Sequence, residues 1–252
     1  MKFKSEIEYL KKYIKENNLN EDYYKECIKE LEKGKPIQYI IGNVNFYGYE
    51  IKVNDKVLIP RFETELLCEK TIKIIKSKYK KRIDILDLGT GSGCIAIALK
   101  KEIDCNMDAL DISIDALEVA KDNAKNNNVD INFINEDMIN YKNKKYDVII
   151  SNPPYIRYDE EIMDIVKNNE PHIALYADDN GLYYYKKIID NIPFITKENF
   201  LIAFEIGIEQ STKIVDYAKN KLKSINITVD RDYSDRERFI FIENNIIRRN
   251  QK

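Results

Sequence analysis

From residue 82 onward, short apolar runs alternate with amphipathic stretches, and this alternation is the feature that most constrains the fold. The pattern predicts strands over 83–88, 106–111, 131–135, 146–151, 200–205, 225–229 and 239–243. It predicts helices over 63–78, 94–100, 115–126 and 210–221. Such alternation indicates a mostly parallel sheet with helices on both faces. Because ligands of these sheets bind beyond the carboxyl ends of the strands, we expect the functional residues in the loops that follow them.

The chain before residue 61 shows two other patterns. Apolar residues recur at helical spacing over 1–36 and predict two helices with a break at 17–20. Residues 37–60 alternate between apolar and polar around Gly48, which predicts a β-hairpin connector. We therefore expect a small N-terminal helical domain (1–36), the connector (37–60) and one larger domain (61–252).

The charge balance bears on possible partners. With 41 Lys and Arg against 43 Asp and Glu, the formal net charge of the 252 residues is −2. Proteins that hold nucleic acid by neutralising phosphates usually carry a basic excess, so we expect no direct nucleic-acid partner. No segment approaches the roughly 20 apolar residues of a membrane span. The first residues lack the features of a signal peptide, so we expect a cytoplasmic protein with no membrane partner. A monomer is the default expectation.

Cysteine and histidine contents argue against metal and nucleophilic chemistry. Cys27, Cys68, Cys94 and Cys105 show no CxxC spacing, which indicates neither a zinc site nor a disulfide framework. The single histidine, His172, argues against a Ser-His-Asp triad, and we read it as structural or as facing a partner. We expect no metal site.

Three of the eight glycines, Gly89, Gly91 and Gly93, lie within five residues directly after the first strand of the alternating region. Glycine lets the backbone turn sharply and removes the Cβ atoms that block close approach of a ligand. A dinucleotide fingerprint would need Gly or Ala where Cys94 stands, and the P-loop motif G-x-x-x-x-G-K-S/T is absent from the sequence. The loop therefore favours a nucleotide-like ligand without a pyrophosphate. The alternative is a tight turn without a ligand.

Acidic residues follow the next two strands. Asp111 ends the second strand 18 residues after Gly93, close to the spacing of an acidic ribose ligand in a βαβ unit. Its carboxylate could accept hydrogen bonds from both ribose hydroxyls, and the alternative is a helix N-cap. After the third strand, Glu136, Asp137 and Met138 could offer adenine an acceptor for its amino group and an apolar surface for its ring. The alternative there is an ordinary polar loop.

The fourth strand is followed by Asn152, Pro153, Pro154 and Tyr155. A residue before proline is kept out of the helical region, and proline has no N–H to fold back into a turn. The carbonyls of this loop are therefore stiffly aimed, Asn152 adds a side-chain carbonyl, and Tyr155 adds a flat face. Such a set can hold a planar group that bears an NH₂, with two acceptors for its protons. The alternative is a loop that is merely rigid.

Together these loops resemble the class I methyltransferases that use S-adenosylmethionine. The tetrapeptide NPPY is similar to that of members which methylate amino groups of amides or nucleobases. Residues 34–65, GKPIQYIIGNVNFYGYEIKVNDKVLIPRFETE, resemble the signature of the release factor glutamine methyltransferase family. Phe62 stands where that signature has a proline, and Met138 stands where an aromatic residue is common. The resemblance extends from residue 34 to residue 243.

The resemblance implies a Rossmann-like class I methyltransferase fold, with a mostly parallel seven-stranded sheet, a small N-terminal helical domain and a hairpin connector. It implies S-adenosylmethionine as cofactor. Residues matching the family's cofactor contacts are Asp87, Gly89, Thr90, Gly91, Ser92 and Gly93 at the methionine end, Asp111 at the ribose, and Asp137 and Met138 at the adenine. Residues matching its glutamine contacts are Asn152, Pro153, Pro154 and Tyr155, and Asn152 also adjoins the cofactor.

The function implied is methylation of the glutamine side-chain amide in the Gly-Gly-Gln motif of class-1 peptide chain release factors. An amide nitrogen is a poor nucleophile, so the expected catalytic residues, Asn152, Pro153 and Tyr155, would hold it in line with the methyl group. The main alternative is an amino-methyltransferase acting on adenine in DNA or guanine in RNA. A third is a binding module that keeps the cofactor fold without catalysis.

Overall fold

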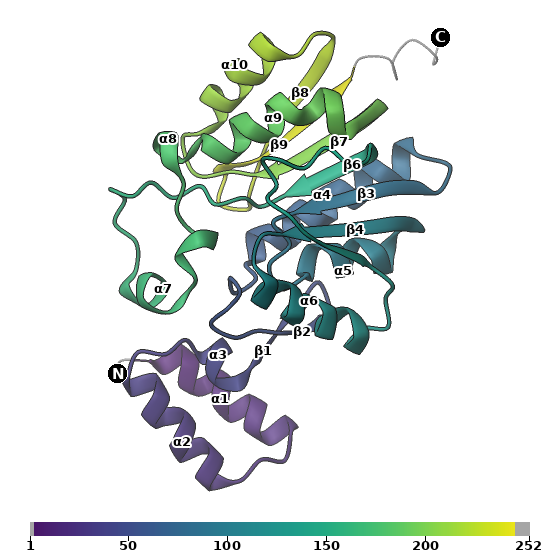
Figure 1. Ribbon diagram of the computed structural model, residues 1–252. Coiled ribbons are helices and arrows are strands. Elements are labelled where there is room, and N and C mark those ends of the chain that lie inside the picture. Colours follow the sequence, from purple (N-terminus) through teal and green to yellow (C-terminus); the bar gives the residue numbers. More distant parts are fainter. Residues whose placement is uncertain (1–2, 245–252) are drawn as a thin grey trace.

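The computed structural model describes residues 3–244 and is built on a seven-stranded sheet with the order β5-β4-β3-β6-β7-β9-β8 (Figure 1). Its strands are β3 (Ile83–Leu88), β4 (Cys105–Asp111), β5 (Asn132–Asn135), β6 (Tyr146–Ser151), β7 (Thr196–Glu205), β8 (Ile225–Arg231) and β9 (Glu237–Asn244). The first five run parallel, and β9 is antiparallel to both β7 and β8. This confirms the predicted mostly parallel sheet. The chain runs outward from β3 through β5 and then returns to β6 beside β3, so a crevice forms where the order reverses.

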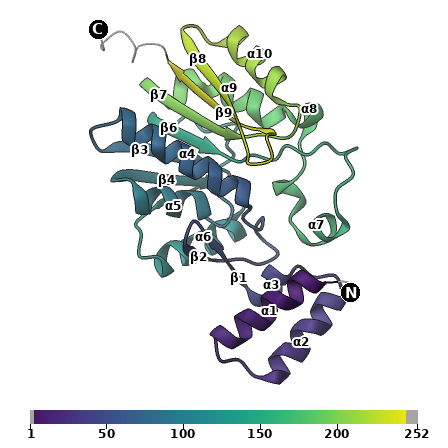
Figure 2. The ribbon, with the colours of Figure 1, turned by 180° about the vertical axis from the view of Figure 1, so that it is seen from behind.

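Helices cover both faces of the sheet, as Figures 1 and 2 show from opposite sides. One face carries α4 (Phe62–Lys78), α5 (Cys94–Glu102) and α6 (Ile114–Asn126), and the other carries α9 (Tyr183–Ile195) and α10 (Ser211–Lys221). Successive strand residues alternate between the two layers. Ile85 of β3 packs with the α4–α5 layer, whereas Leu86 packs with the α9 layer. Both faces are therefore buried, which explains the near-continuous apolar strands.

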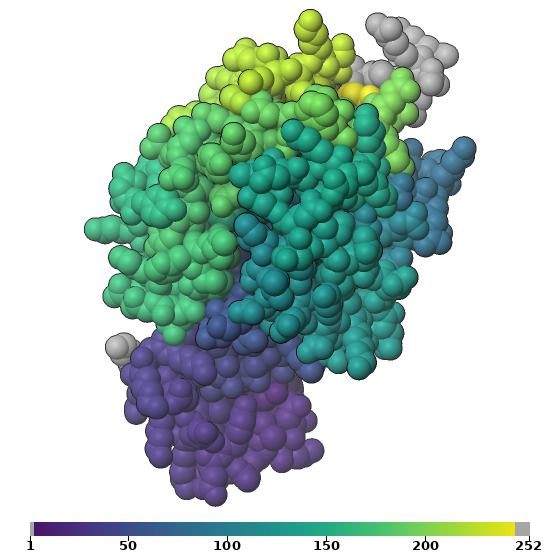
Figure 3. All heavy atoms as spheres, viewed as in Figure 1, coloured from purple at the N-terminus to yellow at the C-terminus, as the bar shows by residue number. Residues whose placement is uncertain are grey.

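The N-terminal helices form a lobe at one end of the molecule, purple in Figure 3. The helices α1 (Lys4–Glu16) and α2 (Glu21–Glu32) pack on the short α3 (Ile37–Ile41) around a separate small core that includes Leu10 and Leu31. The break predicted at 17–20 is confirmed, because α1 ends at Glu16 and Asn20 is the N-cap of α2, its Oδ1 accepting a hydrogen bond from the Tyr23 backbone N–H.

The predicted hairpin over 37–60 was partly wrong, because its first residues form α3. The hairpin itself is β1 (Asn43–Phe46) and β2 (Tyr49–Lys52), paired antiparallel. A five-residue helix is too short to show a helical period, and buried Ile37, Tyr39 and Ile41 mimic the alternation of a strand. The helix ends at Gly42, whose φ of +87° closes it and whose N–H donates to the carbonyl of Gln38.

The connection between β6 and β7 contains α7 (Asp164–Asn169), a 3₁₀ turn (His172–Ala174) and α8 (Asp178–Gly181), followed by α9. It returns beside the loop after β6, where Ile156 bridges to Tyr176. Arg61 forms an ion pair with buried Glu170 and fastens this segment to the start of α4. His172 is exposed, and its Nε2 lies 2.8 Å from the carbonyl oxygen of Lys167.

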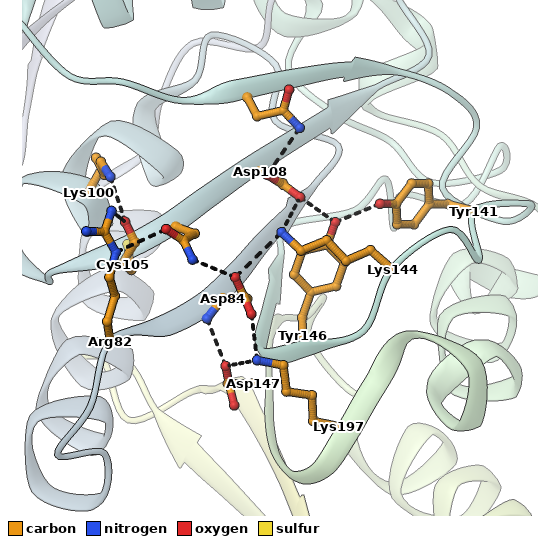
Figure 4. Close-up of polar contacts among 12 residues, drawn as sticks. Arg82, Asp84, Lys100, Cys105, Asp108, Tyr141, Lys144, Tyr146, Asp147 and Lys197 are labelled. Atoms are coloured by element: carbon orange, nitrogen blue, oxygen red, sulfur yellow. Dashed lines mark hydrogen bonds and ion pairs between the residues drawn. The ribbon is translucent and has the colours of Figure 1, made fainter.

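Ion pairs join the amino ends of the parallel strands (Figure 4). Lys197 Nζ contacts Asp84 Oδ2 at 2.6 Å and Asp147 Oδ2 at 2.7 Å. Tyr146 donates to Asp108 Oδ2 at 2.6 Å, and Lys144 reaches the same oxygen at 3.1 Å. These contacts link the strands at their amino ends, whereas the loops in which the sequence predicts functional residues lie at the carboxyl ends. Within residues 3–244, no helix is long and apolar enough to cross a membrane.

Candidate active site

A cavity of about 320 Å³ opens at the carboxyl edge of the sheet, within the size range of small-molecule sites. The surface in Figure 3 is hollowed where the green segment meets the teal one. Seven of the predicted residues line the cavity: Gly89, Gly91, Asp111, Asp137, Met138, Asn152 and Pro154. Residues missed by sequence reasoning complete its wall: Lys56, Val57, Leu58, Ile112, Ser113, Ala116, Ile139, Pro171, Ile173, Ala174, Tyr183 and Tyr184.

The glycine loop forms one wall of this cavity. The backbone N–H groups of Gly89 and Thr90 both donate to the carbonyl of Leu110 at 2.9 Å, which fixes the turn. Gly91 has a φ of +53°, and nothing lies within 4 Å of the place where its Cβ would be. At Gly91 the loop therefore presents open, side-chain-free backbone to the cavity, which is what close approach of a ligand requires.

Asp111 joins the glycine loop to the loop after β4. Its Oδ2 accepts from the Gly91 N–H at 2.8 Å, and its Oδ1 accepts from the Ser113 N–H at 2.9 Å. Burial raises the pKa of Asp111, whereas these backbone hydrogen bonds lower it. Each carboxylate oxygen has a second lone pair. Asp111 can therefore accept from two hydroxyls of a ligand while it holds the loops.

Apolar side chains surround the outer part of the cavity. Met138 lies over the glycine turn, because a Cβ on Gly89 would come within 2.8 Å of Met138 Cε. Ile112, half exposed, and Ile139 add further apolar surface. Asp137 accepts from the Ile139 N–H through Oδ1 at 3.1 Å. A flat ring with an exocyclic amino group fits this combination of apolar surface and carboxylate.

Six of the predicted residues do not line this cavity of about 320 Å³, which we call the main cavity of the site. Asp87 is fully buried and accepts a 2.6 Å hydrogen bond from the Thr90 hydroxyl. Burial raises its pKa to about 7, against the lowering effect of that hydrogen bond. Gly93 is the N-cap of α5, has a φ of +80° and packs on α6. Pro153 is buried, and Tyr155 lines a separate cavity. Thr90 lines a small cavity of about 40 Å³ with Ser92 and Asn152.

Asn152 lines all three of these cavities. It lines the main cavity and also a second one of about 80 Å³ that it shares with Tyr155. The other residues around the second cavity are Leu58, Arg61, Ile156, Val166, Ala174 and Leu175. Asn152 Nδ2 donates to Thr64 Oγ1 at 3.1 Å, and Thr64 donates to Glu205 Oε2 at 2.7 Å. The Asn152 side chain thus adjoins both the main cavity, which suits a nucleotide-like ligand, and a narrower, largely apolar cavity.

Tyr155 is supported from the carboxyl end of β7. Gln210 donates from Nε2 to the Tyr155 carbonyl at 2.9 Å and accepts from the Gly207 N–H through Oε1 at 2.9 Å. Gly181 packs so closely that a Cβ on it would lie 2.2 Å from the Tyr155 carbonyl oxygen. The Tyr155 hydroxyl donates to Glu205 Oε1 at 3.3 Å. The sequence analysis assigned no role to Gly181, Glu205, Gly207 or Gln210.

Comparison with known proteins identifies the class. The family model "Methyltransferase small domain" matches residues 64–169. The fold is similar to that of the Thermus thermophilus 16S rRNA N2 G1207 methyltransferase, solved in complex with AdoMet and guanosine. The TM-score is 0.57 at 13% identity, over 80% of this chain and 49% of the other. The fold and the domain are those of a methyltransferase.

The family follows from sequence relatives. The release factor glutamine methyltransferase of Streptococcus pneumoniae is 38% identical over 231 residues, which cover 90% of this chain and 80% of the relative. The Bacillus subtilis enzyme of the same name is 36% identical over 225 residues, covering 86% and 78%. The chain belongs to the release factor glutamine methyltransferase family.

Proposed function

We propose that this protein transfers a methyl group from S-adenosylmethionine to the side-chain amide nitrogen of the glutamine in the Gly-Gly-Gln motif of class-1 peptide chain release factors. Family membership supports the reaction and its acceptor. The observation that carries the proposal is the position of Asn152 between a nucleotide-like cavity and a second, narrower cavity shared with Tyr155. Donor and acceptor can then approach one side chain from two sides.

The main cavity suits the cofactor. S-Adenosylmethionine supplies a methyl group that is already activated on a positively charged sulfur. Gly91 would take the methionine part against open backbone, with Gly89 beside it, and Asp111 would accept from the ribose hydroxyls. Asp137 and Met138 would take the adenine amino group and ring. Backbone hydrogen bonds already fix the glycine turn and the Asp111 carboxylate. The chain would therefore need little rearrangement at these residues to bind the cofactor.

The loop after β6 suits the acceptor amide. The lone pair of an amide nitrogen is delocalised, so the chain must position the nitrogen and stabilise the positive charge that grows on it. Asn152 Oδ1 and the Pro153 carbonyl would accept the two amide protons, while the Tyr155 ring would pack on the amide plane. The excess proton can leave after transfer. No strong base is required at this loop.

The test is to supply radiolabelled S-adenosylmethionine with four potential acceptors: purified release factor, the same factor with Gln→Ala in its Gly-Gly-Gln motif, duplex DNA and tRNA. We expect label in the wild-type factor alone. Label in the Gln→Ala factor would show a different acceptor residue. Label in DNA or tRNA but not in the factor would overturn the proposed function in favour of a nucleobase methyltransferase.

A further inference from the structure

A buried hydrogen-bonded chain ends at Asn152. It begins at Glu205, which is 1% exposed at the end of β7, and passes through Thr64, 3% exposed in the first turn of α4. The Thr64 hydroxyl oxygen lies 2.7 Å from Glu205 Oε2 and 3.1 Å from Asn152 Nδ2. Thr64 therefore contacts the Asn152 side chain directly, and Glu205, 141 positions from Thr64 in sequence, is linked to it through the Thr64 hydroxyl.

The direction of this chain follows from counting protons. A hydroxyl has one proton to donate, and an ionised carboxylate can only accept. The Thr64 proton is therefore committed to Glu205, in a charge-assisted hydrogen bond. Thr64 Oγ1 can then only accept from Asn152. Of the two ends of the Asn152 amide, the NH₂ alone can donate, so Oδ1 is left facing away from Thr64.

The Thr64 hydroxyl and the Arg238 charge favour the ionised form of Glu205, whereas burial and Glu63 oppose it. The charged and titratable groups that act on it are Arg238 on β9, Glu63 on α4 and Tyr155 after β6. Burial raises the pKa of Glu205 to about 7, while the Thr64 hydrogen bond and the Arg238 charge lower it. Above neutral pH the carboxylate can therefore accept from Thr64 as described.

We propose that Thr64 and Glu205 are positioning residues that fix the Asn152 amide with its oxygen toward the acceptor nitrogen. This inference rests on the proposed function. The two ends of an asparagine amide have nearly the same shape, so packing alone does not distinguish them. With the amide rotated by half a turn, Asn152 would present NH₂ to the NH₂ of the substrate. A donor would then face a donor, and the developing positive charge would lose an acceptor.

The first test compares three variants in a kinetic assay with release factor as acceptor. Thr64→Val keeps the shape but removes the hydroxyl, and we expect kcat to fall roughly tenfold or more. Thr64→Ser restores the hydroxyl and should stay within about threefold of wild type. Thr71→Val is the matched control, because Thr71 is also buried in α4 but donates to the Leu67 carbonyl. Its kcat should not change. The dissociation constant of S-adenosylmethionine, measured by calorimetry, should be the same for all.

The second test measures coupling to Asn152. In an Asn152→Ala background, Thr64→Val should have no further effect on kcat, because Thr64 acts only through the Asn152 amide. Wild-type kcat for Thr64→Val, or an equal loss in both backgrounds, would overturn the inference. Thr64→Ala replaces Thr64→Val in both tests if thermal melting shows that the latter does not fold. If the wild-type protein labels a nucleic acid instead of release factor, the proposed function fails. The same comparison of Thr64→Val in the wild-type and Asn152→Ala backgrounds, with that nucleic acid as methyl acceptor, still decides the role of Thr64.

Discussion

At the scale of single residues, the acceptor set at the loop after β6 gives the most direct prediction. Replacing Asn152 by Ala removes Oδ1 and should cost about 2 to 4 kcal/mol of transition-state stabilisation, as for one preorganised polar contact. The measurement is kcat with release factor, with the affinity for S-adenosylmethionine as a check that the cofactor site is intact. Methyl transfer at near wild-type rate would remove Asn152 from the mechanism.

Gly181 gives a second prediction at this scale. Its φ is +80°, and a Cβ would come within 2.2 Å of the Tyr155 carbonyl oxygen and 2.5 Å of Gln210 Nε2. Gly181→Ala should therefore lower kcat by moving Tyr155 and should destabilise the fold by roughly 2 kcal/mol or more.

Gly34→Ala is the matched control for this effect. Gly34 has a φ of +88° with nothing within 4 Å of its Cβ position, so the change carries the conformational cost alone, about 1 kcal/mol. Urea unfolding of both variants separates the clash from the backbone effect. An equal loss of stability in the two would show that the contact with Tyr155 is not tight.

Much of the candidate site could be predicted from sequence because its parts are local. The glycine loop, Asp111 and the residues 152–155 each sit directly after an apolar strand, and parallel strands bring these loops to one edge. Thr64 and Glu205 could not be paired in this way. Their contact depends on how α4 packs against β7, and two single polar residues 141 positions apart leave no pattern in one sequence.

At the scale of elements, the strands were predicted well because both faces of the sheet are buried and the apolar runs are distinct. No element was predicted between residues 156 and 199, yet α9 lies there and contributes Tyr183 and Tyr184 to the cavity. Its buried residues, Tyr185, Ile188, Ile189, Ile192 and Ile195, do follow a helical period. Pro193 inside the helix and the short turns before it obscure that signal.

The ion pairs at the amino edge of the sheet predict an acid-sensitive contribution to stability. Burial raises the pKa of Asp84. Hydrogen bonds from Lys197 and Asn106, together with the charges of Lys197 and Lys144, lower the pKa by more than burial raises it, so the net shift is downward. A carboxyl with a lowered pKa stabilises the fold above its unfolded value, 3.8 for Asp84. That contribution is lost as the pH falls below this value.

Lys197→Met tests this contribution. The variant should lower the unfolding free energy by about 1 kcal/mol at pH 7, since Lys197 is partly exposed, and the difference from wild type should shrink between pH 4 and pH 3. Lys12→Met is the control, because the exposed pair of Lys12 with Glu16 at 3.8 Å should contribute almost nothing. Urea unfolding at each pH measures both, and a difference that does not change with pH would contradict the role of Asp84.

At the scale of the whole molecule, the amino and carboxyl edges of the sheet differ in how their charged groups are paired and buried. Ion pairs of Lys144 and Lys197 with Asp84, Asp108 and Asp147 link the strands at the amino edge. The carboxyl edge instead carries the three cavities and two fully buried carboxyl groups, Asp87 and Glu205. Burial raises the pKa of both carboxyl groups to about 7. The folded state therefore favours the neutral form of both carboxyl groups.

This predicts that the stability of the fold falls as the pH rises toward neutrality. Between their unfolded pKa values, 3.8 for Asp87 and 4.5 for Glu205, and about 7, the unfolded chain releases protons that the folded chain keeps. The unfolding free energy then decreases with pH, so the stabilisation is complete below the unfolded values and lost through about pH 7.

Asp87→Asn isolates one of the two groups, because Asn keeps an acceptor for Thr90 and does not titrate. Relative to this variant, the wild-type protein should lose about 4 kcal/mol of stability between pH 4 and pH 8. Urea unfolding of both proteins across that range measures the difference. If the two curves stay parallel, Asp87 is not held neutral by the fold. The glycine loop, which Asp87 holds through Thr90, would then bind its ligand beside a buried negative charge. Such a charge would favour a cofactor with a positively charged sulfur.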